Sequence, residues 1–149
     1  MKILMVCLGN ICRSPLAHGI LEREIQMQNL DWEVDSAGTS GWHEGELPDQ
    51  RSIEVAKENG LDITNQRSRA FTKKDFKDFD LIVVMDSSNF SNVKSLADNE
   101  AEEAKIKLLL NYSYPGENRA VPDPYYHGGF PKVYSMIEDA VLNLIKHHV

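Results

Sequence analysis

The fold is decided by the stretch Lys2-Ile3-Leu4-Met5-Val6-Cys7-Leu8-Gly9-Asn10-Ile11-Cys12-Arg13-Ser14-Pro15. Its apolar run, Ile3 to Val6, is short and continuous, which is typical of a buried parallel strand. After Ser14-Pro15 the apolar residues take up helical spacing; serine is a good helix cap, and proline suits the first turn. The sequence therefore predicts a strand ending at Cys7, a tight loop, and a helix from Ser14 to about Gln28.

The loop between Cys7 and Arg13 is long enough to curl round a tetrahedral oxyanion. Backbone N–H groups and the start of the helix would hold the non-bridging oxygens of a phosphate. The Arg13 guanidinium can grip two of those oxygens at once, and the same positive surroundings favour a thiolate at Cys7. A thiolate facing a caged phosphate is suited to nucleophilic phosphoryl transfer. The predicted phosphate-binding residues are Leu8, Gly9, Asn10, Ile11, Cys12, Arg13 and Ser14.

This loop resembles a known signature. Cys-x5-Arg-Ser is typical of cysteine-dependent phosphatases, and the block Val6 to Pro15 so near the start is similar to the low-molecular-weight protein tyrosine phosphatases. The resemblance implies an α/β phosphotyrosine phosphatase I-like fold, related to Rossmann and flavodoxin-like folds, and a cysteinyl-phosphate intermediate. The alternative is an inert core cysteine near a surface arginine.

The remaining chain alternates between strand and helix patterns. Further strands are predicted at residues 32–36, 80–85 and 105–110, and helices at 49–59, 72–76, 86–96 and 131–148. Such alternation indicates a single three-layer α/β domain, residues 1–149, with a central four-stranded parallel sheet and helices on both faces. Ligands of such sheets bind beyond the carboxyl ends of the strands, where Cys7 emerges.

The long segment 111–129 contains Val121-Pro122-Asp123-Pro124. Long loops in compact domains are usually functional, and the two prolines would stiffen the approach of the carboxyl group. A neighbouring phosphate dianion disfavours ionisation of a carboxyl group, so Asp123 is predicted to act as general acid and then as base. The resemblance implies the same role, through the family's Asp-Pro general acid. Without the Cys7 loop, Asp123 would be interpreted as a turn residue.

Three residues are predicted to support the loop. Asn10 can adopt a left-handed backbone, and Ser14 can donate a hydrogen bond to the Cys7 sulfur. The resemblance implies that Ser36 helps to hold the Asn10 side chain, although a plain turn hydroxyl is the alternative. It also implies that Gln66 stands where many members carry a histidine that bonds this asparagine.

Substrate choice is assigned to aromatic residues. Trp42, Tyr125 and Tyr126 lie on two loops expected at the same end of the sheet, where a phenol ring could pass between them. Trp42 could instead anchor its own loop. Cys12 is predicted to capture an oxidised Cys7 as a disulfide, the alternative being a small core residue. All five histidines are interpreted as surface residues.

The composition limits the kinds of partner and cofactor that we expect the chain to bind. The chain has 149 residues, a net charge of −7 and two cysteines. We expect no nucleic acid partner, no metal or other cofactor, no membrane insertion, and a cytoplasmic location. The oligomeric state is left open, with a monomer as one interpretation.

Competing activities are separated by single residues. Arsenate reductases of this fold need further cysteines, which this chain lacks after Cys12. Protein arginine phosphatases carry Thr in place of Ile11 and usually lack the paired tyrosines. A cysteine phosphocarrier would have no use for Arg13 and Asp123. A module that only binds phosphotyrosine would gain nothing from keeping both Cys7 and Asp123. The sequence therefore favours a phosphotyrosine-containing protein as substrate, with a protein arginine phosphatase as the alternative.

Overall fold

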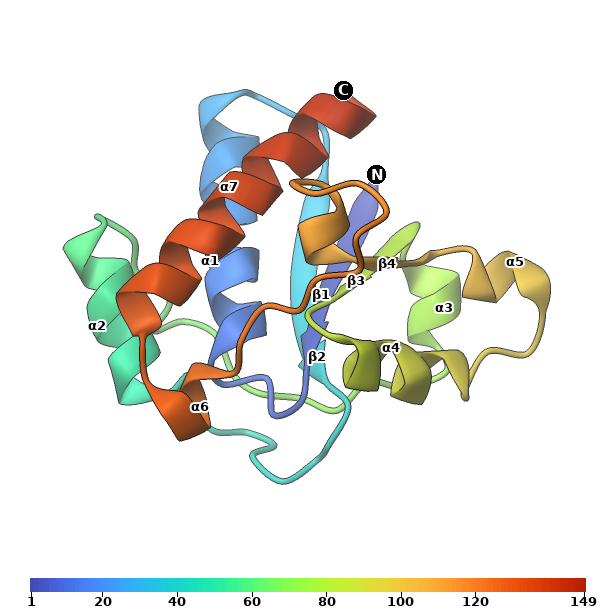
Figure 1. The fold of residues 1–149 in the computed structure, drawn as a ribbon, viewed down its shortest axis with the longest axis horizontal. Helices are drawn as coiled ribbons and strands as arrows, with labels where there is room; N and C mark the ends of the chain where they lie inside the picture. The colour runs from blue at the N-terminus through green and yellow to red at the C-terminus, as the bar shows by residue number, and fades with distance from the viewer.

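A computed structural model describes residues 1–149 and shows one parallel sheet. Its strands are β1 (Lys2–Cys7), β2 (Glu33–Gly38), β3 (Leu81–Val84) and β4 (Ile106–Leu108), in the order β2-β1-β3-β4 (Figure 1). In this register Val6 lies between Ala37 and Val84. The predicted four-stranded parallel α/β fold is confirmed.

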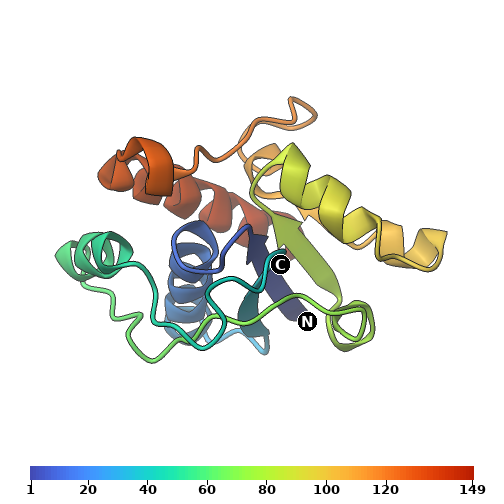
Figure 2. The ribbon, with the colours of Figure 1, turned by 90° about the horizontal axis from the view of Figure 1, so that it is seen from below.

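Alternate side chains of the strands enter two different cores. Ile3 and Met5 pack with α1 (Arg13–Met27), α2 (Gln50–Glu58) and α7 (Phe130–His148). Leu4 and Val6 pack on the other face, with α3 (Asp75–Asp78) and α4 (Ser87–Lys94). Figure 2 shows these two helical layers on either side of the sheet. Because both faces are covered, the central strands consist of apolar residues without polar alternation.

The helices begin mostly where the sequence predicts. The side chain of Asp49 caps α2 by accepting from Arg51 N at 2.8 Å, and Asp86 caps α4 by accepting from Asn89 N at 2.8 Å. Helix α1 is different, because it begins at Arg13 with Cys12 as its N-cap. Ser14 as the cap is therefore wrong; its hydroxyl turns into the preceding loop.

Two predicted segments differ from the structure. The fourth strand ends at Leu108, because Leu109 and Leu110 turn into a 3-10 helix, η1 (Leu109–Asn111), that buries both side chains. Helix α5 (Glu100–Glu103), for which the sequence analysis predicts no element, lies between α4 and β4 and has no buried residue. The loop from 111 to 129 contains a short helix, α6 (Pro124–His127), that begins directly after Asp123.

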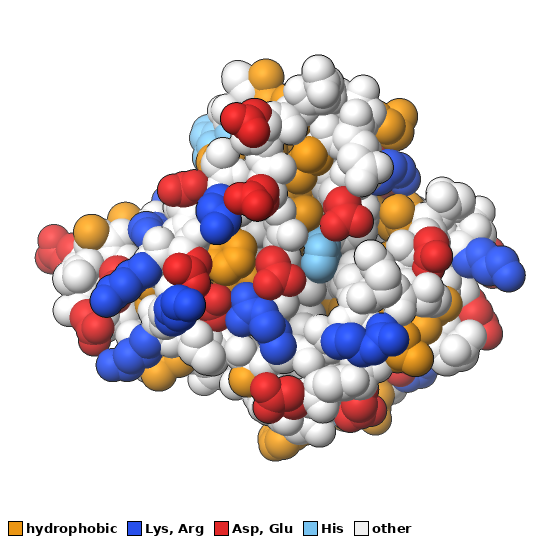
Figure 3. Space-filling view, turned by 180° about the vertical axis from the view of Figure 1, so that it is seen from behind, with side chains coloured by type: hydrophobic (Ala, Val, Ile, Leu, Met, Phe, Trp, Pro, Cys, Tyr) orange, Lys and Arg blue, Asp and Glu red, His pale blue; other side chains and the backbone are white.

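The carboxyl ends of the strands form one end of the molecule. The loop after β1, helix α6 and the loop of residues 39–49 gather there, at the bottom of Figure 1, while both termini lie at the opposite end. On the face in Figure 3, basic side chains are mixed with acidic ones and form no continuous band. No helix has the length and apolar character needed to cross a bilayer.

Candidate active site

Cys7 is the last residue of β1, and its sulfur faces the site from the floor of a pocket. The residue is only 2% exposed. Its Sγ lies 3.0 Å from Ser14 Oγ, as the sequence predicts. Asn10 Nδ2 donates to the same Ser14 oxygen at 2.8 Å, which leaves the Ser14 hydrogen free to point at sulfur. A hydroxyl donor at this distance stabilises a thiolate.

The loop after Cys7 turns its carbonyl groups outward. The carbonyl oxygens of Cys7 and Leu8 accept from Thr39 N and Ser40 N at 2.9 Å each. Further along, Gly9 O accepts from Ser68 Oγ at 3.0 Å and Ile11 O from Asp49 N at 2.8 Å. None of the amide N–H groups of residues 8–12 donates to another protein group. Outward carbonyls and unpaired inward amides form an anion-binding concavity.

Two backbone features allow this curvature. Asn10 has a φ of 55°, the left-handed conformation predicted for it. Gly38, at the end of β2, lies against the loop, and a Cβ there would stand 2.8 Å from Leu8 O and 3.0 Å from Asn10 N. Only glycine permits this approach of two backbones. Gly38 was not among the predicted site residues, although a glycine just after a predicted strand was a signal.

Arg13 is buried, and both nitrogen ends of its guanidinium are bonded. Nη1 donates to Asp86 Oδ2 at 2.8 Å and to Val121 O at 2.9 Å, and Nη2 donates to Asp123 Oδ2 at 3.5 Å. Burial by itself would lower the pKa of Arg13, but attraction to Cys7, Asp86 and Asp123 raises it above its ordinary value. Arg13 thus stays charged within the site. Asp86 was predicted at the start of the helix 86–96, and its role as the partner of Arg13 was missed.

Asp123 caps α6 and faces the loop. Its Oδ1 accepts from Tyr125 N at 3.1 Å, while Oδ2 is the atom that contacts Arg13. The side chain is 24% exposed, at the boundary between the pocket and solvent. A carboxyl group held there can exchange protons with water as well as with a bound group. The structure therefore brings the predicted acid to the predicted nucleophile and arginine.

The three predicted aromatic residues line the same pocket. Trp42 is 74% exposed, Tyr126 64% and Tyr125 42%, and the two tyrosine rings meet edge to face at 5.1 Å. His43 also lines the pocket and contacts Glu46 Oε2 at 2.9 Å, so it is not a plain surface residue as predicted. These side chains form a rim that is far more exposed than the loop beneath it.

A model of the family described as "Low molecular weight phosphotyrosine protein phosphatase" matches residues 2–148. The chain belongs to this family. A *Schizosaccharomyces pombe* protein of that description is 41% identical, over 97% of this chain and 95% of its own length. Among solved structures, a protein tyrosine phosphatase from *Entamoeba histolytica* with Hepes in the active site is 39% identical, with a TM-score of 0.92, covering 99% of this chain and 96% of that one. DARP, a *Drosophila* arginine phosphatase, is 38% identical with a TM-score of 0.92, covering 99% and 98%.

The predicted contact between Ser36 and Asn10 is wrong. Ser36 Oγ lies 3.0 Å from His18 Nδ1, because His18 faces the end of β2 from the second turn of α1. Gln66 Nε2 donates to Pro15 O at 3.1 Å, and its Oε1 is buried without a partner. The groups that hold Asn10 are Ser14 and the backbone N–H of Arg69, which donates to Asn10 Oδ1 at 3.1 Å.

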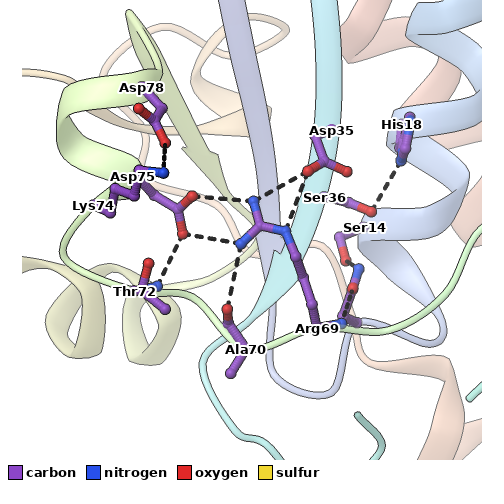
Figure 4. Close-up of polar contacts among 11 residues, drawn as sticks. Ser14, His18, Asp35, Ser36, Arg69, Ala70, Thr72, Lys74, Asp75 and Asp78 are labelled. Carbon is purple, nitrogen blue, oxygen red and sulfur yellow. Dashed lines mark hydrogen bonds and ion pairs between the residues drawn. The ribbon is translucent and has the colours of Figure 1, made fainter. Parts of the chain in front are cut away.

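Arg69 is itself braced between two acidic residues (Figure 4). Its Nη2 lies 3.1 Å from Asp75 Oδ1 and from Asp35 Oδ2. Asp75 also accepts from Thr72 N at 2.9 Å, which ties the segment to the start of α3. The backbone that holds Asn10 is therefore fixed by ion pairs on the far side of β2. Arg69 was not predicted as a site residue, because nothing in its local pattern distinguishes it from a surface arginine.

Two buried groups complete the surroundings of the loop. His18 is not a surface residue as predicted: its side chain is 12% exposed, and burial lowers its pKa despite the nearby Asp35 and Glu22. Burial, and then the charge of Asp49, raise the pKa of the Cys12 thiol. Both Cys7 and Cys12 are free thiols. The predicted disulfide capture by Cys12 stays a prediction.

Proposed function

We propose that this chain hydrolyses phosphotyrosine in proteins through a cysteinyl-phosphate intermediate. The Cys7 thiolate attacks phosphorus in line, the bond from phosphorus to the phenolic oxygen breaks, and Asp123 protonates the departing oxygen. Water then attacks the cysteinyl-phosphate, Asp123 takes a proton from that water, and inorganic phosphate leaves with the thiolate restored. Arg13 and the amides of residues 8–14 stabilise the equatorial oxygens in both steps.

The observation that carries this proposal is the set of unpaired amides around Cys7, with the Arg13 guanidinium held behind them. These donors are fixed before any substrate arrives, because hydrogen bonds to the loop carbonyl oxygens hold the backbone and Asp86 and Val121 O hold Arg13. Preorganised donors of this kind lower the barrier without reorganisation during the reaction. The contact between Asp123 Oδ2 and Arg13 Nη2 is long, at 3.5 Å. A bound phosphate would therefore replace Asp123 as the partner of this nitrogen.

The other site residues have supporting roles in this proposal. Ser14 stabilises the thiolate and Asn10 shapes the loop, while Ser36 acts through His18 on the packing of α1 against β2. Trp42, Tyr125 and Tyr126 contact the substrate ring and bury part of it. We further propose a phosphorylated protein as partner and a reducing compartment such as the cytosol, where both thiols would stay free.

Three enzyme forms test the mechanism: wild type, Cys7→Ser and Asp123→Asn. Each is assayed on phosphotyrosine and phosphoserine peptides and on para-nitrophenyl phosphate, with circular dichroism as the folding control. Cys7→Ser should be inert on every substrate. Asp123→Asn should lose about 100-fold or more on phosphotyrosine but much less on the nitrophenyl ester, whose leaving group hardly needs a proton. Equal losses on both esters would remove Asp123 as the acid.

A second activity, hydrolysis of phosphoarginine, is favoured by the similarity to the *Drosophila* arginine phosphatase. The two substrates differ in the group that passes the rim, a flat phenol or a branched guanidine on a flexible stem. Ile11 lines the pocket here with an apolar side chain, which suits the phenol ring. A phosphoarginine peptide in the same assay decides between them: faster turnover of that peptide than of phosphotyrosine would replace the first proposal.

A further inference from the structure

A second hollow lies along the outer edge of the sheet, away from the phosphate loop. Strand β4 pairs only with β3, so its other edge has no neighbouring strand. A groove of about 920 Å³ follows this edge, with α4 on one side and the end of α7 on the other. None of the residues that line it lines the pocket at Cys7. A groove of this size has room for several residues of a peptide.

The backbone of β4 offers hydrogen-bonding groups to this groove. Lys105 O accepts from Ile82 N at 2.9 Å, and Ile82 lies opposite Ile106 in the register. In a parallel pair this arrangement turns Lys107 toward β3, and it turns the N–H and C=O groups of Ile106 and Leu108 to the outer edge. No side chain or loop bonds the N–H and C=O groups of Ile106. Leu108 differs, because it is the N-cap of η1 and its C=O accepts the first bond of that helix. The outward groups that stay unpaired form a short template for another strand.

The charge of the groove is opposite to that of the whole chain. The charged residues that line it are two lysines, Lys107 and Lys146, and no Asp or Glu lines it, although the net charge of the chain is −7. His147 and His148 add imidazole rings. Lys107 projects from β4 as an exposed residue between the buried Ile106 and Leu108. The remaining lining includes the aromatic ring of Tyr112, which stacks edge-on with His147 at 5.6 Å. This lining favours an anionic and partly apolar occupant.

We propose that this groove binds an acidic segment of another protein, which adds to β4 as an extended strand. Its backbone would pair with the N–H and C=O of Ile106 and with the N–H of Leu108, which supply affinity without dependence on side chains. Its alternate side chains would be acidic, facing Lys107 and Lys146. This pattern follows from the twofold alternation of a strand, where every second residue faces the same side. The groove is a docking site separate from the pocket at Cys7.

The test is a fluorescence anisotropy titration with a labelled eight-residue peptide of alternating Glu and Val, free of tyrosine and phosphate. Lys107→Glu combined with Lys146→Glu should weaken binding about tenfold or more. The matched control combines Lys57→Glu with Lys77→Glu, two exposed lysines outside both pockets, and should change binding less than about twofold. Both double variants should hydrolyse para-nitrophenyl phosphate at the wild-type rate, which shows that they are folded.

Two further arms identify the mode of binding. A peptide N-methylated at alternate residues should lose binding, because it cannot pair with a strand edge, and amide shifts should appear at Ile106 and Leu108. The proposal would be overturned if the control variant weakened peptide binding as much as the Lys107→Glu, Lys146→Glu variant. It would also be overturned if the methylated peptide bound as tightly as the unmethylated one, or if amide shifts were confined to residues 8–14. Competition by free phosphate at the peptide's own concentration would reassign the groove to a small anion. Sedimentation would reassign the groove to a second copy of this chain if it showed a dimer. That dimer would have to separate into monomers in the Lys107→Glu, Lys146→Glu variant and persist in the control variant.

Discussion

The phosphate loop and the aromatic rim are two parts of one pocket, but they are built in opposite ways. In the loop, Cys7 and Arg13 are each 2% exposed. Four hydrogen bonds to loop carbonyl oxygens, donated by residues 39–40, 49 and 68, fix the backbone. On the rim, Trp42 and Tyr126 are 74% and 64% exposed, Trp42 on a loop and Tyr126 on the four-residue helix α6. Chemistry that needs placement within tenths of an ångström is assigned to the braced region.

The difference has an energetic basis. Donors held in a buried site act on developing charge at low dielectric, where each is worth far more than in water. An exposed ring on a loop contributes mainly by burying its own area when substrate arrives. Changes to the loop should therefore reduce the rate of reaction on every substrate, whereas changes to the rim should reduce recognition of some substrates.

Arg13→Lys should have the largest effect. A lysine ammonium is a single point of charge and cannot bond Asp86, the Val121 carbonyl and a phosphate together, as the guanidinium fork can. We expect kcat/KM on para-nitrophenyl phosphate to fall on the order of 1,000-fold. Arg119→Lys is the control, because Arg119 is exposed and contacts Glu117, so its activity should match wild type. A tenfold loss or less for Arg13→Lys would mean that charge alone suffices.

Gly38→Ala should break the loop without touching any reacting atom. Its Cβ would meet the backbone at Leu8 and Asn10, and neither can rotate away. We expect kcat to fall roughly 10- to 100-fold and the free energy of unfolding to fall by about 1–3 kcal/mol, measured by urea denaturation. Gly41→Ala is the matched control, since its nearest atom, the Ala70 Cβ, is 4.0 Å away. If both variants behave alike, the close approach of β2 does not shape the loop.

Much of this site could be predicted, because its signals are local in the sequence. The strand Ile3–Val6, the loop that follows it and the start of α1 are consecutive, so the spacing of Cys7 and Arg13 already implies a nest at the mouth of a strand. Asp123 was recognised by its two prolines and its position in a long loop. Each of these depends on residues within a few positions of one another.

What could not be predicted depends on how distant segments cross. Arg69 N reaches Asn10 from 59 positions away, and Asp86 reaches Arg13 from 73. No local pattern tells which hydroxyl will face which side chain, so Ser36 was paired with Asn10 rather than with His18. The end of β4 was missed for a related reason: Leu108 to Leu110 are equally apolar, and only packing against α7 bends the last two out of the strand.

Trp42→Ala tests the comparison between loop and rim by changing a rim residue alone. Removing this exposed indole should raise KM for a phosphotyrosine peptide about three- to tenfold with little change in kcat, because ring contact is lost but the loop is intact. Acetyl phosphate, which has no ring, should be turned over as by wild type. Leu47→Ala, another exposed apolar residue outside the pocket, is the control. An equal loss on acetyl phosphate would place Trp42 in the support of the loop.

The smallest expected effect concerns His18, which is buried behind the loop. Burial lowers the pKa of its imidazole in the folded protein, so below pH 6.5 the unfolded chain binds the proton more readily. The free energy of unfolding should therefore fall as pH drops through this value, by at most about 1.4 kcal/mol per pH unit from this group. His18→Gln should lose less stability than wild type between pH 7.5 and 5.5 in urea titrations. His127→Gln, which removes an exposed imidazole, should keep the wild-type slope. If His18→Gln also keeps the wild-type slope of unfolding free energy against pH, then protonation of His18 does not destabilise the folded protein. The braced loop region would then tolerate a charge as readily as the rim does.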